Sequence, residues 1–189
     1  DAERDLIFEL MCAGWMSKIA TEVDLVEPPD VVCTYRGARW GVACKAVYGS
    51  AIRAVKAVKE GVDQLEKSDC SEGAVVVRMT DVFPHGELVP GRSEGMRTIP
   101  SFPSEADLLS HAASLAVPFR DEVFRRSQGG AAFFSRSKKL VAIWFVTHSF
   151  ANVSTPHGAI SAMFPIPLYI ARDPSALPFL DDFITATQL

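Results

Sequence analysis

The segment 28–49, PPDVVCTYRGARWGVACKAVYG, constrains the fold of this chain more than any other part of the sequence. On both sides of its central RGAR, apolar residues alternate with small, polar or charged ones. Because successive side chains of a β-strand point to opposite faces, this alternation predicts two strands joined by a tight turn. Gly37 followed by Ala38 suits a type II′ turn, which takes glycine at its first central position. That turn predicts a register in which Asp30 lies directly opposite Lys45.

The predicted hairpin has two faces of different character. One face carries only apolar or aromatic residues and is expected to face the core: Val31, Cys33, Tyr35, Trp40, Val42 and Cys44. The other face carries Asp30 and Lys45 beside the small residues Gly41 and Ala43. A slip of one residue would place Lys45 in the core, so the apolar pattern determines which face each side chain takes. Two interpretations of the second face stay open: an ordinary cross-strand ion pair on a solvated surface, or an open cleft that holds a ligand.

The rest of the chain predicts one mixed α/β domain of residues 1–189. Helical spacing of apolar residues predicts helices at 3–20, 51–68 with Ser50 as N-cap, 104–127 and 177–187, and Pro118 is expected to kink or split the third. Apolar runs predict strands at 21–27, 74–79, 140–150 and 165–171, the last at a sheet edge because it contains prolines. Residues 81–103, rich in proline, glycine and charge, predict an inserted surface loop.

Composition narrows the class of protein. Hydrophobic residues make up 48% and charged residues 22%, which is typical of a globular chain. No apolar run approaches the roughly 20 residues that span a bilayer, so no membrane partner is expected. The four cysteines show no CxxC pair or metal-ligand spacing, which favours core thiols in a reducing, cytoplasmic compartment. The chain begins at Asp1, without a methionine, and we expect it to be a trimmed piece of a longer parent protein.

The charge pattern is ambiguous about nucleic acid. The net charge of −4 argues against a generally basic coat protein. Two local stretches are nevertheless positive: residues 36–67 hold seven basic and three acidic residues, and residues 120–139 hold six basic and two acidic ones. Each stretch fits either a side of the molecule that faces phosphates or an ordinary solvated surface.

The order of these elements is similar to a known superfamily. A helix, a strand, a hairpin that begins at Pro29-Asp30 and ends at Lys45, a second helix and a buried strand resemble the PD-(D/E)xK nucleases, over roughly residues 3–80. The resemblance implies a restriction-endonuclease-like mixed sheet flanked by helices, with an αβββαβ core and C-terminal additions. It implies a metal-dependent nuclease that hydrolyses phosphodiester bonds of nucleic acid, with DNA as the first candidate. A homodimer is also compatible with it.

The resemblance also implies roles for particular residues. Asp30 would be a metal-binding carboxylate, and Lys45 would position or activate the attacking water. Glu9 on the first helix and Gln64 on the second match further positions of the family pattern. Asp30, Glu9 and the backbone carbonyl of Cys44 would then hold Mg²⁺ or Mn²⁺. Four basic residues would anchor the flanking phosphates: Arg36, Arg39, Lys56 and Lys59.

One position departs from the family pattern. Ala43 stands where the motif has its second acid, so the triplet reads ACK. Magnesium usually takes one or two carboxylates, so either Glu9, or failing it Glu22 or Glu27, supplies the missing oxygen, or the site does not cleave. The alternative function is therefore a degraded nuclease-fold module that binds nucleic acid or a protein partner without cleavage. A third hypothesis, outside the resemblance, is a small-molecule enzyme built on the histidines of the 148–157 loop.

Overall fold

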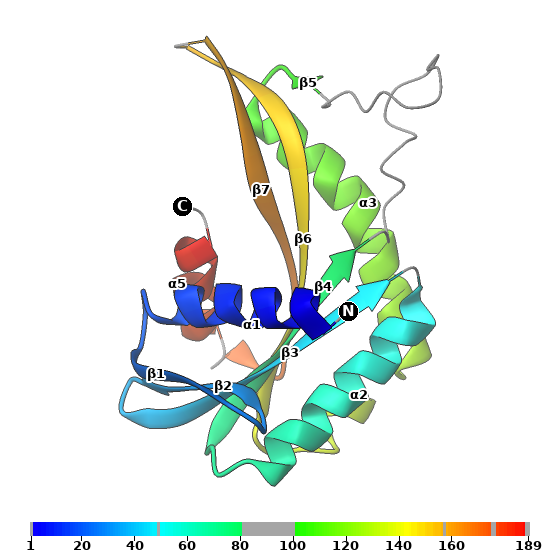
Figure 1. Cartoon of the computed structure of the whole chain (residues 1–189). Helices are drawn as coiled ribbons and strands as arrows, with labels where there is room; N and C mark the ends of the chain where they lie inside the picture. Colours follow the sequence, from blue (N-terminus) through cyan, green and yellow to red (C-terminus); the bar gives the residue numbers. More distant parts are fainter. Residues whose placement is uncertain (1, 49, 81–100, 157, 175–176, 188–189) are drawn as a thin grey trace.

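The computed structural model describes residues 2–48, 50–80, 101–156, 158–174 and 177–187 (Figure 1). The strands are β1 (Thr21–Val26), β2 (Asp30–Tyr35), β3 (Ala38–Tyr48), β4 (Glu72–Thr80), β5 (Ser101–Phe102), β6 (Leu140–Thr155) and β7 (Gly158–Ala171). The helices are α1 (Ala2–Met16), α2 (Ala51–Lys67), α3 (Glu105–Arg126), α4 (Ala131–Phe134) and α5 (Leu177–Thr187). None of the described helices is long and apolar enough to span a membrane.

The described strands form a single mixed sheet in the order β1-β2-β3-β4-β6-β5, with β7 paired to β6. The first three strands form an antiparallel meander. Helix α2 then leads into β4, which runs parallel to β3, and β6 in turn runs parallel to β4. The β6–β7 hairpin extends beyond the rest of the sheet, with α3 along one side (Figure 1). The chain is therefore mixed α/β, as predicted.

Helices cover both faces of the sheet and create two cores. On one face, α1 and α5 cover an aromatic core that includes Trp15 of α1, Trp40 and Trp144. On the other face, α2, α3 and α4 cover smaller aliphatic residues such as Val75 and Val77, together with Phe145. Both faces of β3 and β4 are thus buried, which explains the continuous apolar run at 74–77.

The predicted elements agree with the structure at most positions. Helix α5 has the predicted bounds, and Ser50 caps α2 by accepting a hydrogen bond from the Arg53 N–H at 3.5 Å. The expected split at Pro118 is wrong, because α3 continues through this exposed proline. Strands β6 and β7 are longer than predicted, α4 was not predicted, and the last residues of the expected 81–103 loop form β5. The remainder of that loop, 81–100, lies outside the described residues.

The hairpin forms, but its predicted turn is wrong. Tyr35 pairs with Ala38, so the turn residues are Arg36 and Gly37, whose φ angles are 48° and 80°. Positive φ at both central residues is the signature of a type I′ turn, whose twist matches that of the flanking strands. The register is displaced by two residues from the prediction, and Asp30 lies level with Ala43 rather than with Lys45. A two-residue displacement leaves every side chain on its predicted face.

Candidate functional site

The face of the hairpin that carries Asp30 is covered by α2 and is not an open cleft, contrary to one of the two expectations. Ala43 is completely buried beneath this helix. A Cβ atom built on Gly61 of α2 would lie 2.7 Å from a Val75 methyl and 3.4 Å from the Ala43 Cβ. Glycine therefore allows the helix to approach the sheet closely at this point. The space beside Asp30 is filled by the protein itself.

Asp30 lies at the start of β2, and its carboxylate accepts hydrogen bonds from three donors of the protein. Oδ2 accepts from the Cys44 backbone N–H at 2.6 Å and from the Lys45 ammonium at 3.3 Å. Oδ1 accepts from the Gln64 amide at 3.2 Å. The register displacement does not separate Asp30 from Lys45, because the long lysine side chain spans the diagonal between them. Three of the four residues assigned to catalysis therefore meet: Asp30, Lys45 and Gln64.

Burial dominates the electrostatics of this cluster. Asp30 is 7% exposed, and its burial raises the pKa of its carboxyl group above the usual value. The charge of Lys45 and the hydrogen bonds from Cys44, Lys45 and Gln64 oppose this rise without cancelling it. The Asp30 carboxylate is thus held by its partners at a position where ionisation is less favourable than in water.

Gln64 carries the one unsatisfied group of the cluster. Its amide nitrogen donates to Asp30, which determines the orientation of the side chain, because the opposite orientation would place Oε1 against a carboxylate. Oε1 is buried and has no hydrogen-bond partner among the described residues. A buried acceptor of this kind calls for a donor, such as an enclosed water molecule.

A shallow pocket of about 330 Å³ opens beside the cluster. It is lined by Lys45, Glu60, Asp63, Gln64 and Lys67. The Lys45 side chain is 19% exposed, so its ammonium group reaches both Asp30 and this pocket. Glu60, Asp63 and Lys67 were not identified from the sequence. Their helical spacing from Gln64 could have identified them, because residues three or four positions apart are neighbours on a helix surface.

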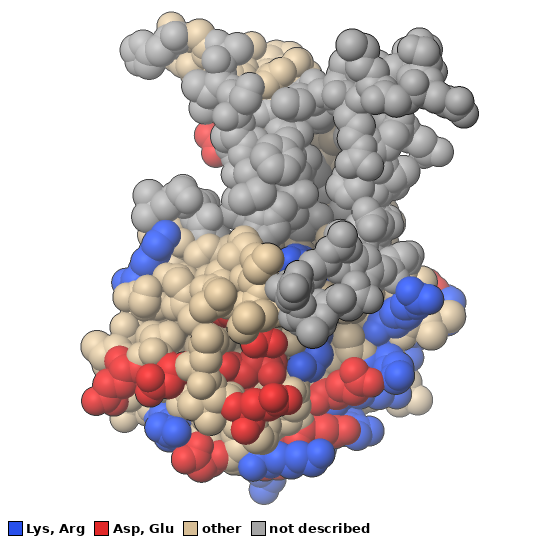
Figure 2. All heavy atoms as spheres, in the orientation of Figure 1, with Lys and Arg blue, Asp and Glu red and all other residues tan. Residues whose placement is uncertain are grey.

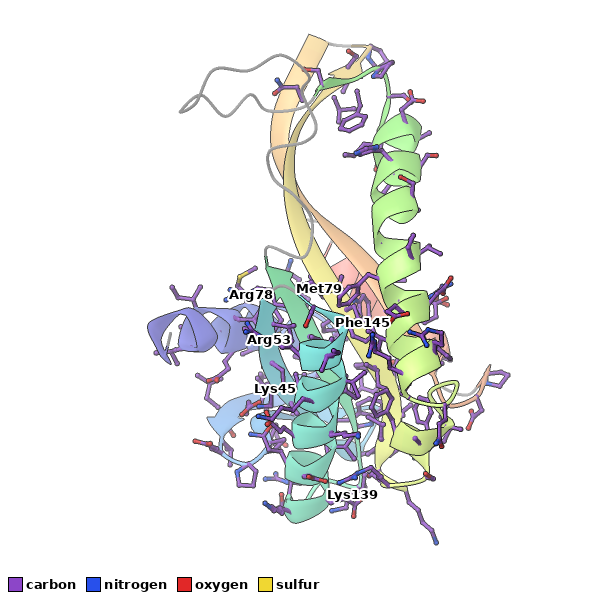
Figure 3. The ribbon with its side chains drawn as sticks, turned by 90° about the vertical axis from the view of Figure 1, so that its right-hand side faces the viewer. Lys45, Arg53, Arg78, Met79, Lys139 and Phe145 are labelled. Carbon is purple, nitrogen blue, oxygen red and sulfur yellow. The ribbon has the colours of Figure 1, made fainter. Side chains whose placement is uncertain are left out.

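The flank of α2 next to Lys45 continues this pocket. Residues at helical spacing place five side chains on this side of the helix: Arg53, Lys56, Glu60, Gln64 and Lys67. We call this set the α2 flank. In Figure 3, Lys45 and Arg53 lie on the same side of α2, away from the side on which Phe145 packs. The surface in Figure 2 shows basic groups interleaved with acidic ones, rather than one large basic patch.

The two carboxylates of the predicted metal site come from different faces of the sheet: Asp30 accepts a hydrogen bond from Gln64 of α2. Glu9 lies on α1, which packs on the opposite face of the sheet from α2. Among the described residues, no group of three or more His, Cys, Asp or Glu side chains is placed to hold a metal ion. With Ala43 in place of an acid and both Asp30 oxygens already hydrogen-bonded, the residues present do not fit Mg²⁺ or Mn²⁺.

The other residues expected to contribute to the metal site, Cys44, Glu22 and Glu27, lie in three different surroundings. The Cys44 thiol lies in the core on the α1 side, where burial and the neighbouring Cys12 raise its pKa well above the usual value. Glu22 is exposed on β1 and accepts a hydrogen bond from the Thr34 hydroxyl at 2.8 Å. Glu27 is exposed in the turn before β2.

The four basic residues assigned to phosphate binding do not form one surface. Arg36 pairs with Asp182 of α5 at 3.0 Å. Arg39 pairs with Asp69, also at 3.0 Å. Both arginines lie at the turn of the hairpin, about 20 Å along β3 from Lys45 at ~3.3 Å per residue. Lys56 and Lys59 are exposed on α2, and Lys56 belongs to the α2 flank.

The histidine hypothesis falls largely outside the described part of the chain. The backbone at residue 148 belongs to β6, where it pairs with Pro165, while residue 157 is not described. The comparisons with known proteins add no relative: no protein-family model, no curated protein and no solved structure matches this chain. The geometry of the Asp30 cluster and the α2 flank is therefore the basis for a functional proposal.

Proposed function

We propose that this chain is a divergent restriction-endonuclease-like protein that binds the phosphate backbone of nucleic acid without hydrolysing it. One observation carries the proposal: the carboxylate of Asp30 accepts three hydrogen bonds from the protein, while the ammonium of Lys45 reaches the pocket on α2. Asp30, Lys45 and Gln64 lie together, and among the described residues no group of three potential ligands is placed to hold a metal ion.

The connectivity supports the fold assignment within this proposal. A helix, an antiparallel meander of three strands, a second helix and a parallel strand follow one another from α1 to β4. This is the αβββαβ order that the resemblance implies. Asp30 begins the second strand and Lys45 lies in the third, which are the positions that the nuclease pattern assigns to them.

Hydrolysis is disfavoured because the described residues offer no group of metal ligands that could activate water. A nuclease of the expected type lowers the pKa of a metal-bound water. Without a second carboxylate, the described residues offer no metal site, and α2 occupies the space above Ala43. Lys45 is instead available as a cation that positions a phosphate.

Charge on α2 supports phosphate binding. The first turn of this helix contains no acidic residue, although acidic residues there would stabilise the helix dipole. Arg53, Lys56 and Lys59 precede the first acid, Glu60. The ion pair of Lys56 with Glu60 is 3.5 Å long and highly exposed, so it holds the lysine only weakly. Arg53 and Lys56 lie on the same side of α2 as Lys45, where a nucleic-acid backbone can follow the helix.

Binding and cleavage assays together test the proposal. Fluorescence anisotropy with labelled single-stranded and duplex DNA and RNA should give binding that weakens as salt rises. Lys45→Ala and Lys67→Ala should each weaken it several-fold, whereas Glu66→Ala, an exposed substitution on the same helix, should not. No product should form with Mg²⁺ or Mn²⁺.

Two results would contradict the proposal in different ways. Absence of binding to every nucleic acid at low salt would remove the phosphate-binding function. Cleavage that requires Mn²⁺ and is lost in Lys45→Ala would instead show an active nuclease, with a metal ligand that the described residues do not provide.

A further inference from the structure

The two lateral edges of the sheet differ in how they are protected against pairing with another strand. Edge strand β1 is six residues long, has an irregular register between Thr21 and Asp24, and carries the charged residues Glu22 and Asp24. Short length, irregularity and charge are the features that keep an edge from pairing. Strand β7 has 14 residues, and its register with β6 is regular throughout. In the described part of the chain, it pairs with no strand other than β6.

The direction of the backbone N–H groups of β7 follows from its register. Arg172, just after the strand, donates its N–H to the Val141 carbonyl of β6. Because N–H groups alternate in direction along a strand, even-numbered residues of β7 face β6 and odd-numbered ones face the open edge. Pro165 and Pro167 are both odd-numbered, so they remove two donors from the open edge and leave the ladder with β6 intact. The prolines therefore protect only the half of β7 nearer the core, residues 165–171.

The distal half of β7, residues 158–164, keeps its outward donors. Ala159, Ser161 and Met163 each present an N–H and a carbonyl group to the open edge. No Lys, Arg, Asp or Glu occurs from Leu140 to Ala171, so charge does not protect this edge either. Figure 1 shows this half of the hairpin extending beyond the core, with α5 only near its base. A regular, uncharged edge of this kind is a template for strand addition.

We propose that the distal half of β7 pairs with the same segment of a second copy of this chain, in an antiparallel two-fold arrangement. With the two-fold axis at Ser161, Ser161 pairs with itself and Ala159 pairs with Met163 of the other copy. These narrow pairs form up to about six hydrogen bonds, two for each pair. The sheets of the two copies then join into one continuous sheet.

A second copy suits this edge better than a charged partner does. A two-fold interface brings each residue close to its own symmetry mate, so any charge near the axis would meet a like charge. The chain carries a net charge of −4, yet this stretch contains no charged residue. The stretch around Ser161 also satisfies the backbone requirement for two-fold pairing, because none of its outward-facing residues, Ala159, Ser161 and Met163, is a proline.

A pair of substitutions at one position tests the inference. Ser161→Pro removes the outward N–H in the same way as Pro165 and Pro167 do, while the ladder with β6 remains. Ser161→Ala keeps that N–H and is the matched control. Sedimentation velocity across a dilution series should show a dimer for the wild type and for Ser161→Ala. We expect self-association of Ser161→Pro to weaken about tenfold or more, because two edge hydrogen bonds are lost.

A second variant keeps the test decisive if Ser161→Pro does not fold. Ser161→Cys should form a disulfide between two copies under mild oxidation, because Cα atoms in a narrow pair lie about 5.5 Å apart. The wild type, whose cysteines are all buried, should not form this product. A wild type that stays monomeric at every concentration would overturn the inference. A dimer that is unchanged in Ser161→Pro and not cross-linked in Ser161→Cys would do so as well.

Discussion

On its α1 side, the β2–β3 hairpin is buried by large aromatic side chains, whereas on its α2 side it is buried by small residues and a polar cluster. Trp40 stacks on Phe179 of α5 with ring centroids 4.3 Å apart. On the opposite face, Gly61 of α2 approaches Ala43 closely, and Asp30 is enclosed with its hydrogen-bond partners. Burial alone therefore does not distinguish a core face from a candidate site. The distinction comes from the groups that are buried.

The largest difference between the two faces should appear when a charge is added on the α2 side. Ala43→Glu restores the acid of the nuclease pattern beneath α2, where it has no partner. We expect the free energy of unfolding to fall by about 3–5 kcal/mol, as for other unpaired buried charges, without any Mn²⁺-dependent cleavage. Urea unfolding measures the loss, and Ala43→Gln, similar in size but uncharged, separates charge from volume. A stable Ala43→Glu protein that cleaves DNA would contradict our account of the site.

On the α1 side, the corresponding test removes volume instead of adding charge. Phe183 of α5 is completely buried and contacts Trp15 and Trp144 edge-on, with centroids 5.7 and 4.4 Å away. Phe183→Ala should lower the free energy of unfolding by about 3–5 kcal/mol through lost burial and a cavity. Nucleic-acid binding by the folded fraction should not change. A loss below about 1 kcal/mol would show that α5 packs less tightly than the structure indicates.

The polar cluster should respond differently to two substitutions of Asp30. Asp30→Ala leaves the Cys44 N–H and the Gln64 amide without their acceptor and should cost about 1–3 kcal/mol. Asp30→Asn should cost less, because it keeps an acceptor and resembles the protonated acid that burial favours. Urea unfolding at fixed pH compares the two. Equal losses would mean that the negative charge, and not the acceptor, holds the cluster together.

The raised pKa of Asp30 adds a pH dependence with a definite sign. Between its ordinary value of 3.8 and its higher folded-state value, the folded protein binds more protons at this residue than the unfolded chain does. The stability of the wild type relative to Asp30→Asn should therefore fall as pH rises through that interval. Unfolding curves at several pH values measure this difference. A difference that instead grew with pH would show that Lys45 outweighs burial.

The smallest effect is expected at the contact between the hairpin turn and α5. The Tyr35 hydroxyl donates to Asp182 at 2.6 Å, beside the ion pair of Asp182 with Arg36. Tyr35→Phe should cost about 0.5–1.5 kcal/mol, the usual value of one hydrogen bond. Arg36→Gln should cost less, because that ion pair is exposed to solvent. Chemical unfolding would contradict this order if the Arg36 variant were the less stable one.

Local sequence predicted most secondary structure but not the hairpin register. Alternation along the hairpin assigned each side chain to its face, because strand periodicity is a local property. It could not choose between two turns that lie one position apart, since the two-residue difference in register between them keeps every side chain on the same face. The positive φ of Arg36 is also unusual for a residue with a side chain. The prediction therefore placed Gly37 at the first central position of the turn, where the structure has Arg36.

The sequence alone determined which residues share a face, and it placed Asp30, Lys45 and Gln64 in one candidate site. Only the tertiary structure decided that this face is closed, because closure depends on how near α2 comes to the sheet. That distance is determined by small residues far apart in the chain, such as Gly61 and Ala43, and by Val75 of the next strand. Packing between distant segments has no local periodic signal, and for that reason the closure of this face became visible only in the folded chain.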